Sequence, residues 1–169
     1  MSIPSRQRAR LAAGLLAMSA AAVGAAPAQA TSYDDELHDV RAATARFHSV
    51  KQALKAGYHP TPECVSSPAG TMGVHFENPA LMADPELDPL RPEILLYAPG
   101  PGGKLKLVAV EYWQAAAAAP STPTLFGRAF NGPMPGHHPG MATHYDLHVW
   151  VWADNPAGTF SDFNPALSC

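Results

Sequence analysis

The sequence predicts an α+β domain in which one N-terminal amphipathic helix packs on a curled, mostly antiparallel sheet of about five strands, forming a half-barrel or small barrel. Three observations support this fold class. A helical apolar stripe occurs near residues 33–57, short apolar runs separated by Pro and Gly follow residue 60, and the last of these runs alternates in character from residue to residue.

Residues 1–30 have the features of a cleaved signal peptide. Arg6, Arg8 and Arg10 precede a short apolar run, and Ala28-Gln29-Ala30 is a small-x-small cleavage signature. We therefore expect a single domain over 31–169, secreted or periplasmic. No other run approaches the roughly 20 apolar residues of a membrane span.

The mature chain is acidic. Three of the 11 Lys and Arg residues lie in the signal peptide, which leaves eight against 14 Asp and Glu residues, a net charge of −6. Because no basic cluster interrupts this surface, nucleic-acid binding is disfavoured.

Residues 33–57 carry the helical pattern. Acidic residues come first and basic residues follow, which complements the helix dipole, and Gly57 stops the helix. The apolar stripe consists of Leu37, Val40, Thr44, Phe47, Val50 and Leu54.

Five later segments have the character of strands, and PGPGG at 99–103 joins the second and third as a hairpin. The acidic, proline-rich segment 77–92 is expected to cross the surface, and 115–123 is low in complexity. The predicted strands are 71–76, 93–98, 104–113, 125–130 and 144–152.

Cys64 and Cys169 are the two cysteines of the chain. In an oxidising compartment they are expected to form one disulfide that ties the chain end to the region after the helix. A pair of soft metal ligands is the alternative.

The segment HYDLHVWVW at 144–152 gives the sharpest functional signal. Alternation places His144, Asp146 and His148 on one face, together with Trp150 and Trp152. Because alternate side chains of a strand project the same way, His144 and His148, four residues apart, are expected to face one divalent ion, and Asp146 between them is a third ligand or a residue that orients them.

Two other predicted strands carry candidate ligands. Glu111 lies in an apolar row with Leu105, Leu107, Ala109 and Trp113, where an unpaired charge would be costly. A structural salt bridge with an Arg is the alternative for Glu111. His75 lies opposite the apolar side of 71–76, so a curled sheet can bring it to the same place.

The palindrome MPGHHPGM at 134–141 precedes this strand. Its Pro and Gly content predicts a turn, and its thioethers suit Cu(I). We interpret it as a lid over the site, made by Met134, His137, His138 and Met141.

The sequence therefore predicts a small exported metalloprotein that binds one transition-metal ion, Cu, Zn, Fe or Mn, through His75, Glu111, His144 and His148. If the protein is an enzyme, an oxidoreductase or a hydrolase, Asp146 and Glu111 are the candidate catalytic residues. The alternative is a secreted, non-catalytic binding module whose Trp-lined pocket holds a small apolar or aromatic ligand. Whether the protein is an enzyme is left open.

The mature chain also resembles a family of small secreted bacterial proteins. The resemblance runs from the helix through MGVHFENPALM, RPEILLYAPG, LVAVEY, LFGRAFNGPM and HYDLHVWVWADNPAG to the terminal SC. It implies a single exported domain and carries over no activity, cofactor or site residue.

Overall fold

The structure is a computed structural model that describes Met1 and residues 33–169. The predicted signal peptide lies outside the described residues. Among the described residues, none of the helices has the length and apolar character needed to cross a membrane.

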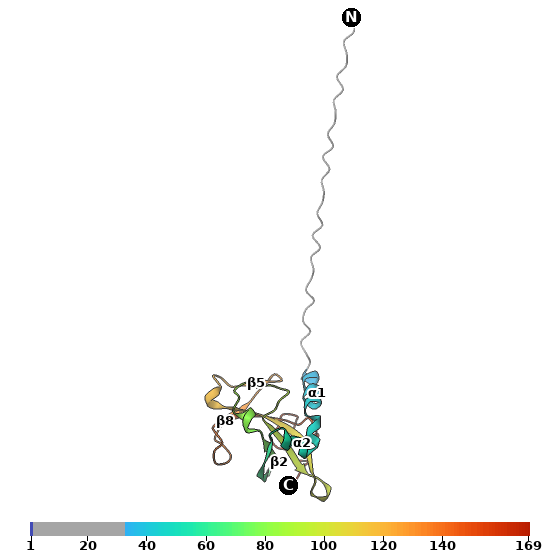
Figure 1. The fold of residues 1–169 in the computed structure, drawn as a ribbon, viewed down its shortest axis with the longest axis vertical. Helices are drawn as coiled ribbons and strands as arrows, with labels where there is room; N and C mark the ends of the chain where they lie inside the picture. The colour runs from blue at the N-terminus through green and yellow to red at the C-terminus, as the bar shows by residue number, and fades with distance from the viewer. Residues whose placement is uncertain (2–32) are drawn as a thin grey trace. The chain divides into compact units, whose positions relative to one another are not determined.

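A six-stranded antiparallel sheet, curled into a half-barrel, forms the centre of the domain (Figure 1). Its strands lie in the order β1-β2-β3-β4-β8-β7, so β4 and β8 are neighbours although about 30 residues separate them. The strands are β1 (His59–Ser67), β2 (Gly70–Glu77), β3 (Ile94–Pro99), β4 (Leu105–Ala115), β7 (Asn131–Met134) and β8 (His144–Val149). The predicted α+β class and the 99–103 hairpin are confirmed.

The single helix predicted for 33–57 is three pieces, α1 (Tyr33–Thr44), η1 (Ala45–His48) and α2 (Val50–Lys55). The break falls at Ser49, whose backbone is extended. Tertiary contacts compete with the helical hydrogen bonds here, because the Tyr97 hydroxyl donates to the Phe47 carbonyl at 2.6 Å. The stripe still packs on the sheet, since Phe47 is buried in its core.

Three strand predictions need correction. Segment 125–130 is a small hairpin of β5 (Thr124–Leu125) and β6 (Arg128–Ala129), and β1 and β7 were not predicted as strands. Both strands contain proline, which argued against a strand in the sequence. Proline is tolerated in edge strands, and β1 and β7 are the two edges of the sheet. Short helices also occur at α3 (Pro79–Met82), η2 (Pro101–Gly103) and η3 (Ala116–Ala118).

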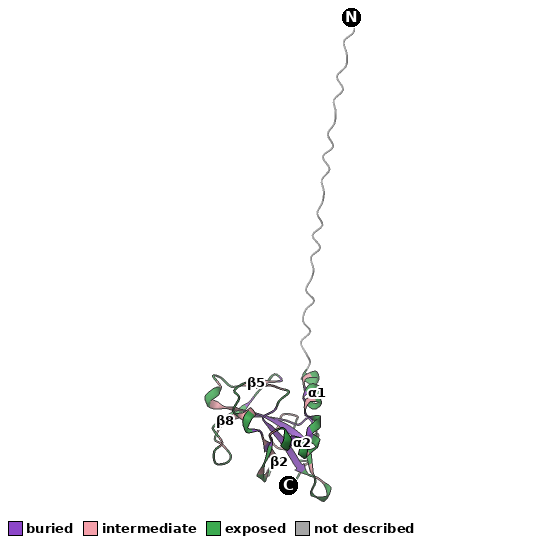
Figure 2. Ribbon diagram, viewed as in Figure 1, coloured by how far each residue is buried: buried purple, intermediate pink, exposed green. Residues whose placement is uncertain are grey.

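The sheet has a different layer on each face. The helices pack on one face, the helix-covered face, whose core includes Leu95, Tyr97 and Val110. Figure 2 shows the central strands as buried and much of the helical surface as exposed. The second face, which we call the histidine face, carries a smaller apolar cluster of Ile94, Leu96, Ala98, Val108, Ala109, Trp113 and Trp150.

A bulge in β4 changes which side chains share a face. Leu96 pairs with Ala109, and the next residue, Tyr97, pairs with Leu107, so Val108 is the extra residue. Leu107 therefore packs on the helix-covered face, while Ala109 packs on the histidine face. The prediction of one row from Leu105 to Trp113 was wrong for the part before the bulge.

The last predicted strand ends earlier than expected, at Val149. Trp152 consequently does not share the histidine face. Its indole nitrogen donates to the Thr44 hydroxyl at 3.1 Å, and its ring lies 4.3 Å from that of His48.

The Cys64–Cys169 disulfide is present and confirms the predicted pairing, so the soft-metal alternative is wrong for these residues. It joins β1 to the chain end across 105 residues of sequence. Thr71 and Asn164 also exchange two backbone hydrogen bonds of 3.0 Å, which hold the C-terminal segment to β2.

We expect the Cys64→Ser/Cys169→Ser variant to unfold at lower urea concentration than the wild type. Closing a loop of this length is worth at most about 4–5 kcal/mol, and the Thr71–Asn164 pairing lowers the expected loss. Urea unfolding followed by tryptophan fluorescence measures it, with reduced wild type as the control. Equal midpoints for the variant and the oxidised wild type would contradict this role.

Candidate metal centre

Three strands contribute polar side chains to the histidine face. Glu111 on β4 pairs directly with His148 on β8. His75 on β2 pairs with Leu96 on β3, which in turn pairs with Ala109, two residues from Glu111. His75 thus reaches Glu111 diagonally across β3, and the antiparallel register fixes the relation among the three residues.

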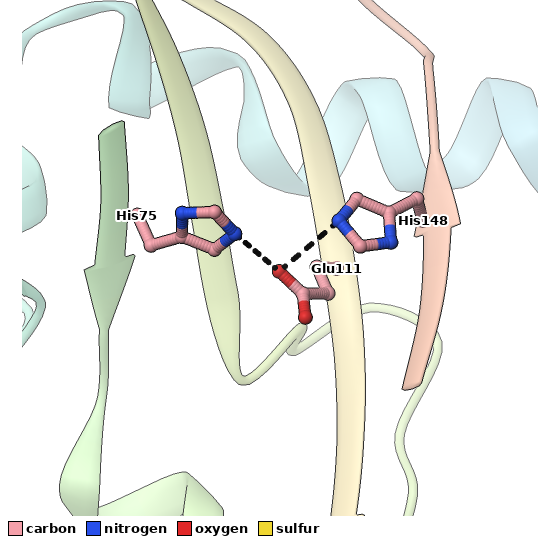
Figure 3. Close-up of side chains that lie close together, drawn as sticks. All are labelled: His75, Glu111 and His148. Atoms are coloured by element: carbon pink, nitrogen blue, oxygen red, sulfur yellow. Dashed lines mark ion pairs between the residues drawn. The ribbon is translucent and has the colours of Figure 1, made fainter. Parts of the chain in front are cut away.

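The three side chains converge on a small volume (Figure 3). His75 Nε2 lies 3.3 Å from Glu111 Oε2, and His148 Nε2 lies 3.6 Å from the same oxygen. One ligand atom from each residue lies within 4.8 Å of the other two. An ion held at about 2.0–2.2 Å separates neighbouring ligand atoms by roughly 3.0–3.5 Å, so small side-chain movements would complete a site.

This group is buried without hydrogen bonds to match. The Glu111 and His148 side chains are 4% and 1% exposed. In the part of the chain that the structure describes, neither Glu111 Oε2 nor His148 Nε2 has a hydrogen-bond partner. Unpaired buried polar atoms are costly, and an ion bound between them would remove that cost.

The charges of the group depend on one another. Burial works against a charge on Glu111, but His148 and His75 outweigh it and hold the pKa of Glu111 below its usual range. Burial also works against a charge on His75, yet Glu111 raises the pKa of His75 above its usual value. Burial lowers the pKa of His148. This shift favours the neutral form of the ring, which is the form that binds metal.

A second group of acidic residues lies on the other side of His148. His148 Nδ1 is 3.7 Å from Asp162 Oδ1, and this oxygen accepts a hydrogen bond of 2.7 Å from the side-chain amide of Asn131. Asp146, Asp162 and His148 each offer a ligand atom within 4.8 Å of the others. Burial, together with the charges of Glu111 and Asp162, raises the pKa of Asp146 to about 8.

His144 was predicted as a ligand, but the structure does not bring it into either group. Its Nδ1 lies 3.0 Å from the Ala142 carbonyl, and its Nε2 is 3.9 Å from Asp146 Oδ2. Its ring stacks on Trp113 with the centroids 5.5 Å apart. His144, Asp146 and His148 are all buried, as expected for a shared face. Only Asp146 and His148 belong to a candidate metal group, and His144 lies outside both groups.

The 134–141 segment adjoins this face. His138 Nε2 lies 3.0 Å from Glu77 Oε1, and the His137 ring lies 4.9 Å from that of His144. Met141 packs against the apolar cluster of the histidine face, and its sulfur accepts a hydrogen bond from the His137 amide at 3.5 Å. Met134 instead belongs to β7, where it pairs with His144.

Two pockets in the described part of the chain bear on the alternative of a Trp-lined site. One, of about 390 Å³, is lined by Ala69, Asn131, Ala157, Phe160, Ser161, Asp162 and Phe163. The other, of about 310 Å³, is lined by Asp84, Glu86, Leu87, Asp88, Pro89 and Arg91. Neither is lined by tryptophan, whereas Trp113 and Trp150 pack within the apolar cluster.

Sequence reasoning missed two acidic residues. Asp162 lies in an irregular segment, and only the terminal cysteine indicated that this segment docks on the domain. Glu93 was predicted only as the start of a strand, yet it is 2% exposed and its carboxylate accepts a hydrogen bond from the Trp113 amide at 3.0 Å.

Comparison of the chain with protein-family models, with curated proteins and with solved structures found no significant match. The resemblance to small secreted bacterial proteins therefore stays a prediction, and the function is argued from the site alone.

The buried carboxyl of Glu93 predicts that the stability of the metal-free chain depends on pH. Burial raises its pKa from 4.5 to about 8. Because this folded-state pKa lies above the unfolded one, the stabilising contribution is fully present below about pH 4.5 and is lost as the pH rises through about 8.

We expect the free energy of unfolding to fall from about pH 5 to about pH 9, with a slope for this group of at most about 1.4 kcal/mol per pH unit. The Glu93→Gln variant, which is neutral throughout, should lose less, and the remaining fall includes the contribution of Asp146. Urea unfolding at a series of pH values measures both curves. Parallel curves would show that Glu93 does not hold its proton in the folded state.

Proposed function

We propose that this protein binds one divalent transition-metal ion through His75 Nε2, a Glu111 carboxylate oxygen and His148 Nε2. One observation carries the proposal. Ligand atoms from three separate strands lie within 4.8 Å of one another, and two of them are buried with no hydrogen-bond partner among the described residues. Glu111 Oε2 lies within ion-pair distance of both imidazoles, at 3.3 and 3.6 Å, but neither contact is a hydrogen bond.

The ligand set favours a transition metal over Ca²⁺ or Mg²⁺. Two imidazoles and one carboxylate suit Zn, Fe, Mn or Cu, whereas the harder cations prefer oxygen ligands alone. Two histidines with one carboxylate is a combination found in catalytic zinc sites and in non-haem iron sites, and both kinds keep coordination positions free.

Catalysis is the finer part of the proposal. When bound, the ion would supply Lewis acidity and lower the pKa of a coordinated water. Burial raises the pKa of Asp146 to about 8, and its carboxyl lies beside His148 in the second acidic group. When only this ion is bound, Asp146 is the residue proposed to accept or donate a proton, while Glu111 serves as a ligand.

The loop at 135–141 is proposed to cover the site. Its ion pair between His138 and Glu77 joins it to β2, on the side of the sheet where His75 projects. Breaking this ion pair would remove the side-chain link between His138 and β2, while Met141 would still pack on the apolar cluster.

Export remains part of the proposal. The arginine-rich, apolar segment at 1–30 and the disulfide both suit an oxidising compartment. In such a compartment a site built from imidazole and carboxylate stays intact where thiolate ligands would oxidise.

We expect the purified metal-stripped protein to bind Co²⁺ or Zn²⁺ and the His75→Ala/His148→Ala variant to bind far more weakly. Loss of ligands should cost at least the 10–100-fold in affinity that loss of an outer partner costs. Isothermal titration calorimetry with Zn²⁺ and the visible spectrum of the Co²⁺ form measure it.

His38 and His59 provide the matched control, because both are exposed and neither belongs to a candidate group. The His38→Ala/His59→Ala variant should bind like the wild type. A second variant, Glu111→Gln, keeps the side-chain volume and separates loss of binding from loss of folding. A wild type that takes up none of Zn²⁺, Co²⁺, Cu²⁺, Fe²⁺ or Mn²⁺ would overturn the proposal.

A further inference from the structure

We propose that Asp146, Asp162 and the Nδ1 atom of His148 form a second cation site, so that the His148 ring bridges two metal ions. This inference rests on the proposed function, since it takes the Nε2 atom of His148 to be a ligand of the first ion.

The geometry of His148 supports this arrangement. Its two ring nitrogens face different carboxylates, with Nε2 at 3.6 Å from Glu111 and Nδ1 at 3.7 Å from Asp162. Figure 3 shows the second nitrogen on the side of the ring away from Glu111. The ligand atoms of Asp146, Asp162 and His148 lie within 4.8 Å of one another, the same criterion that the first group meets.

Unpartnered atoms point into the second group as they do into the first. His148 is 1% exposed and Asp146 is 3% exposed. Neither His148 Nδ1 nor Asp146 Oδ1 has a hydrogen-bond partner in the described part of the chain. Asp162 Oδ1, which lies 3.7 Å from His148 Nδ1, already accepts a hydrogen bond from the Asn131 side-chain amide at 2.7 Å. Hydrogen bonding within the protein thus leaves both atoms free to bind an ion.

The charges around His148 also favour a second cation. Glu111, Asp146 and Asp162 surround its ring, and the ion pairs that the described residues make with them involve only histidines. One divalent ion in the first group leaves Asp162, and Asp146 once it has lost its proton, without a cation on the far side of the ring. A second divalent ion there would balance them.

The second site differs from the first in access to solvent. The Asp162 side chain is 41% exposed, and Asp162 and Asn131 both line the pocket of about 390 Å³. The ligands of the first group are nearly or fully buried. We therefore expect the second ion to exchange faster than the first.

Binding of the second ion requires His148 Nδ1 to lose its proton, and the proton held by the Asp146 carboxyl, whose pKa is raised to about 8, leaves for solvent as well. The N–H bond at His148 Nδ1 breaks, the proton passes to solvent through the open pocket, and a bond from Nδ1 to the second ion forms. No electron is transferred. Cu²⁺ and Zn²⁺ suit such a site because both bind imidazole nitrogen strongly.

A simpler role for Asp162 gives a different result. Asp162 would then only accept a hydrogen bond from His148 Nδ1 and orient the ring for the first ion. In that case the protein binds one ion, and the Asp162 variants weaken it without changing the stoichiometry.

The test is a titration of the metal-stripped full chain with Cu²⁺ at pH 7.5, about one pH unit above the ordinary histidine pKa, read by calorimetry and electron paramagnetic resonance. We expect two ions per chain, with the signal of the singly loaded protein lost or split as the second ion couples to the first. The Asp146→Asn/Asp162→Asn variant should bind one ion and keep an uncoupled signal. Asp34→Asn/Asp39→Asn makes the same change in net charge on α1 and should still bind two.

A third variant separates the two proposals. His75→Ala/Glu111→Gln should lose the buried ion and keep one ion that a chelator removes quickly. Near-ultraviolet circular dichroism checks that each variant is folded. A wild type that binds one ion, sensitive to His75 but not to Asp146 and Asp162, overturns this inference and leaves the proposed function standing. A wild type that binds none overturns both.

Discussion

The direct pairing of Glu111 on β4 with His148 on β8 is the constraint on which the rest of the site depends. It places a carboxylate and an imidazole side by side on one face of the sheet, where both are almost fully buried. Burial removes water as a partner for these groups, so their charge must be balanced from within the protein or by an ion. The two candidate metal groups form around this pair, because His75 lies close to Glu111, and Asp146 and Asp162 lie close to His148.

The two faces of the sheet divide stability from chemistry. Helices cover one face and form an apolar core with it. The Tyr97 hydroxyl also donates a hydrogen bond to the Phe47 carbonyl of the helical segment. The histidine face has a smaller apolar cluster, and the C-terminal segment and the loop at 135–141 adjoin it. The bulge at Val108 shifts the alternation along β4, so Leu107 packs on the helix-covered face while Ala109 packs on the histidine face.

Local pattern predicted much of this and long-range pairing limited the rest. The alternation in 144–149 correctly placed Asp146 and His148 together, because a period of two needs no knowledge of neighbouring strands. That His75 reaches Glu111 depends on strand order and on register across β3, which a single sequence does not encode locally. The apparent row from Leu105 to Trp113 failed at a bulge that no Gly or Pro marks.

His144 and Asp162 show the same limit at the site itself. The spacing of His144 and His148 predicted a chelating pair. His144 is the first residue of β8, however, and its ring stacks on Trp113. Asp162 lies 14 residues beyond His148 in an irregular segment. It returns to the His148 ring because backbone hydrogen bonds hold this segment to β2 and the disulfide joins its end to β1. Neither outcome follows from residue type and spacing alone.

The most direct measurement of the central claim is a crystal structure of the protein grown with Zn²⁺, with anomalous diffraction recorded on both sides of the zinc absorption edge. The account predicts an anomalous peak about 2.0–2.2 Å from His75 Nε2, a Glu111 carboxylate oxygen and His148 Nε2. The opposite result is a structure in which zinc is bound at other positions and no anomalous peak lies between these three side chains, which contact only one another. That result would contradict the proposed site.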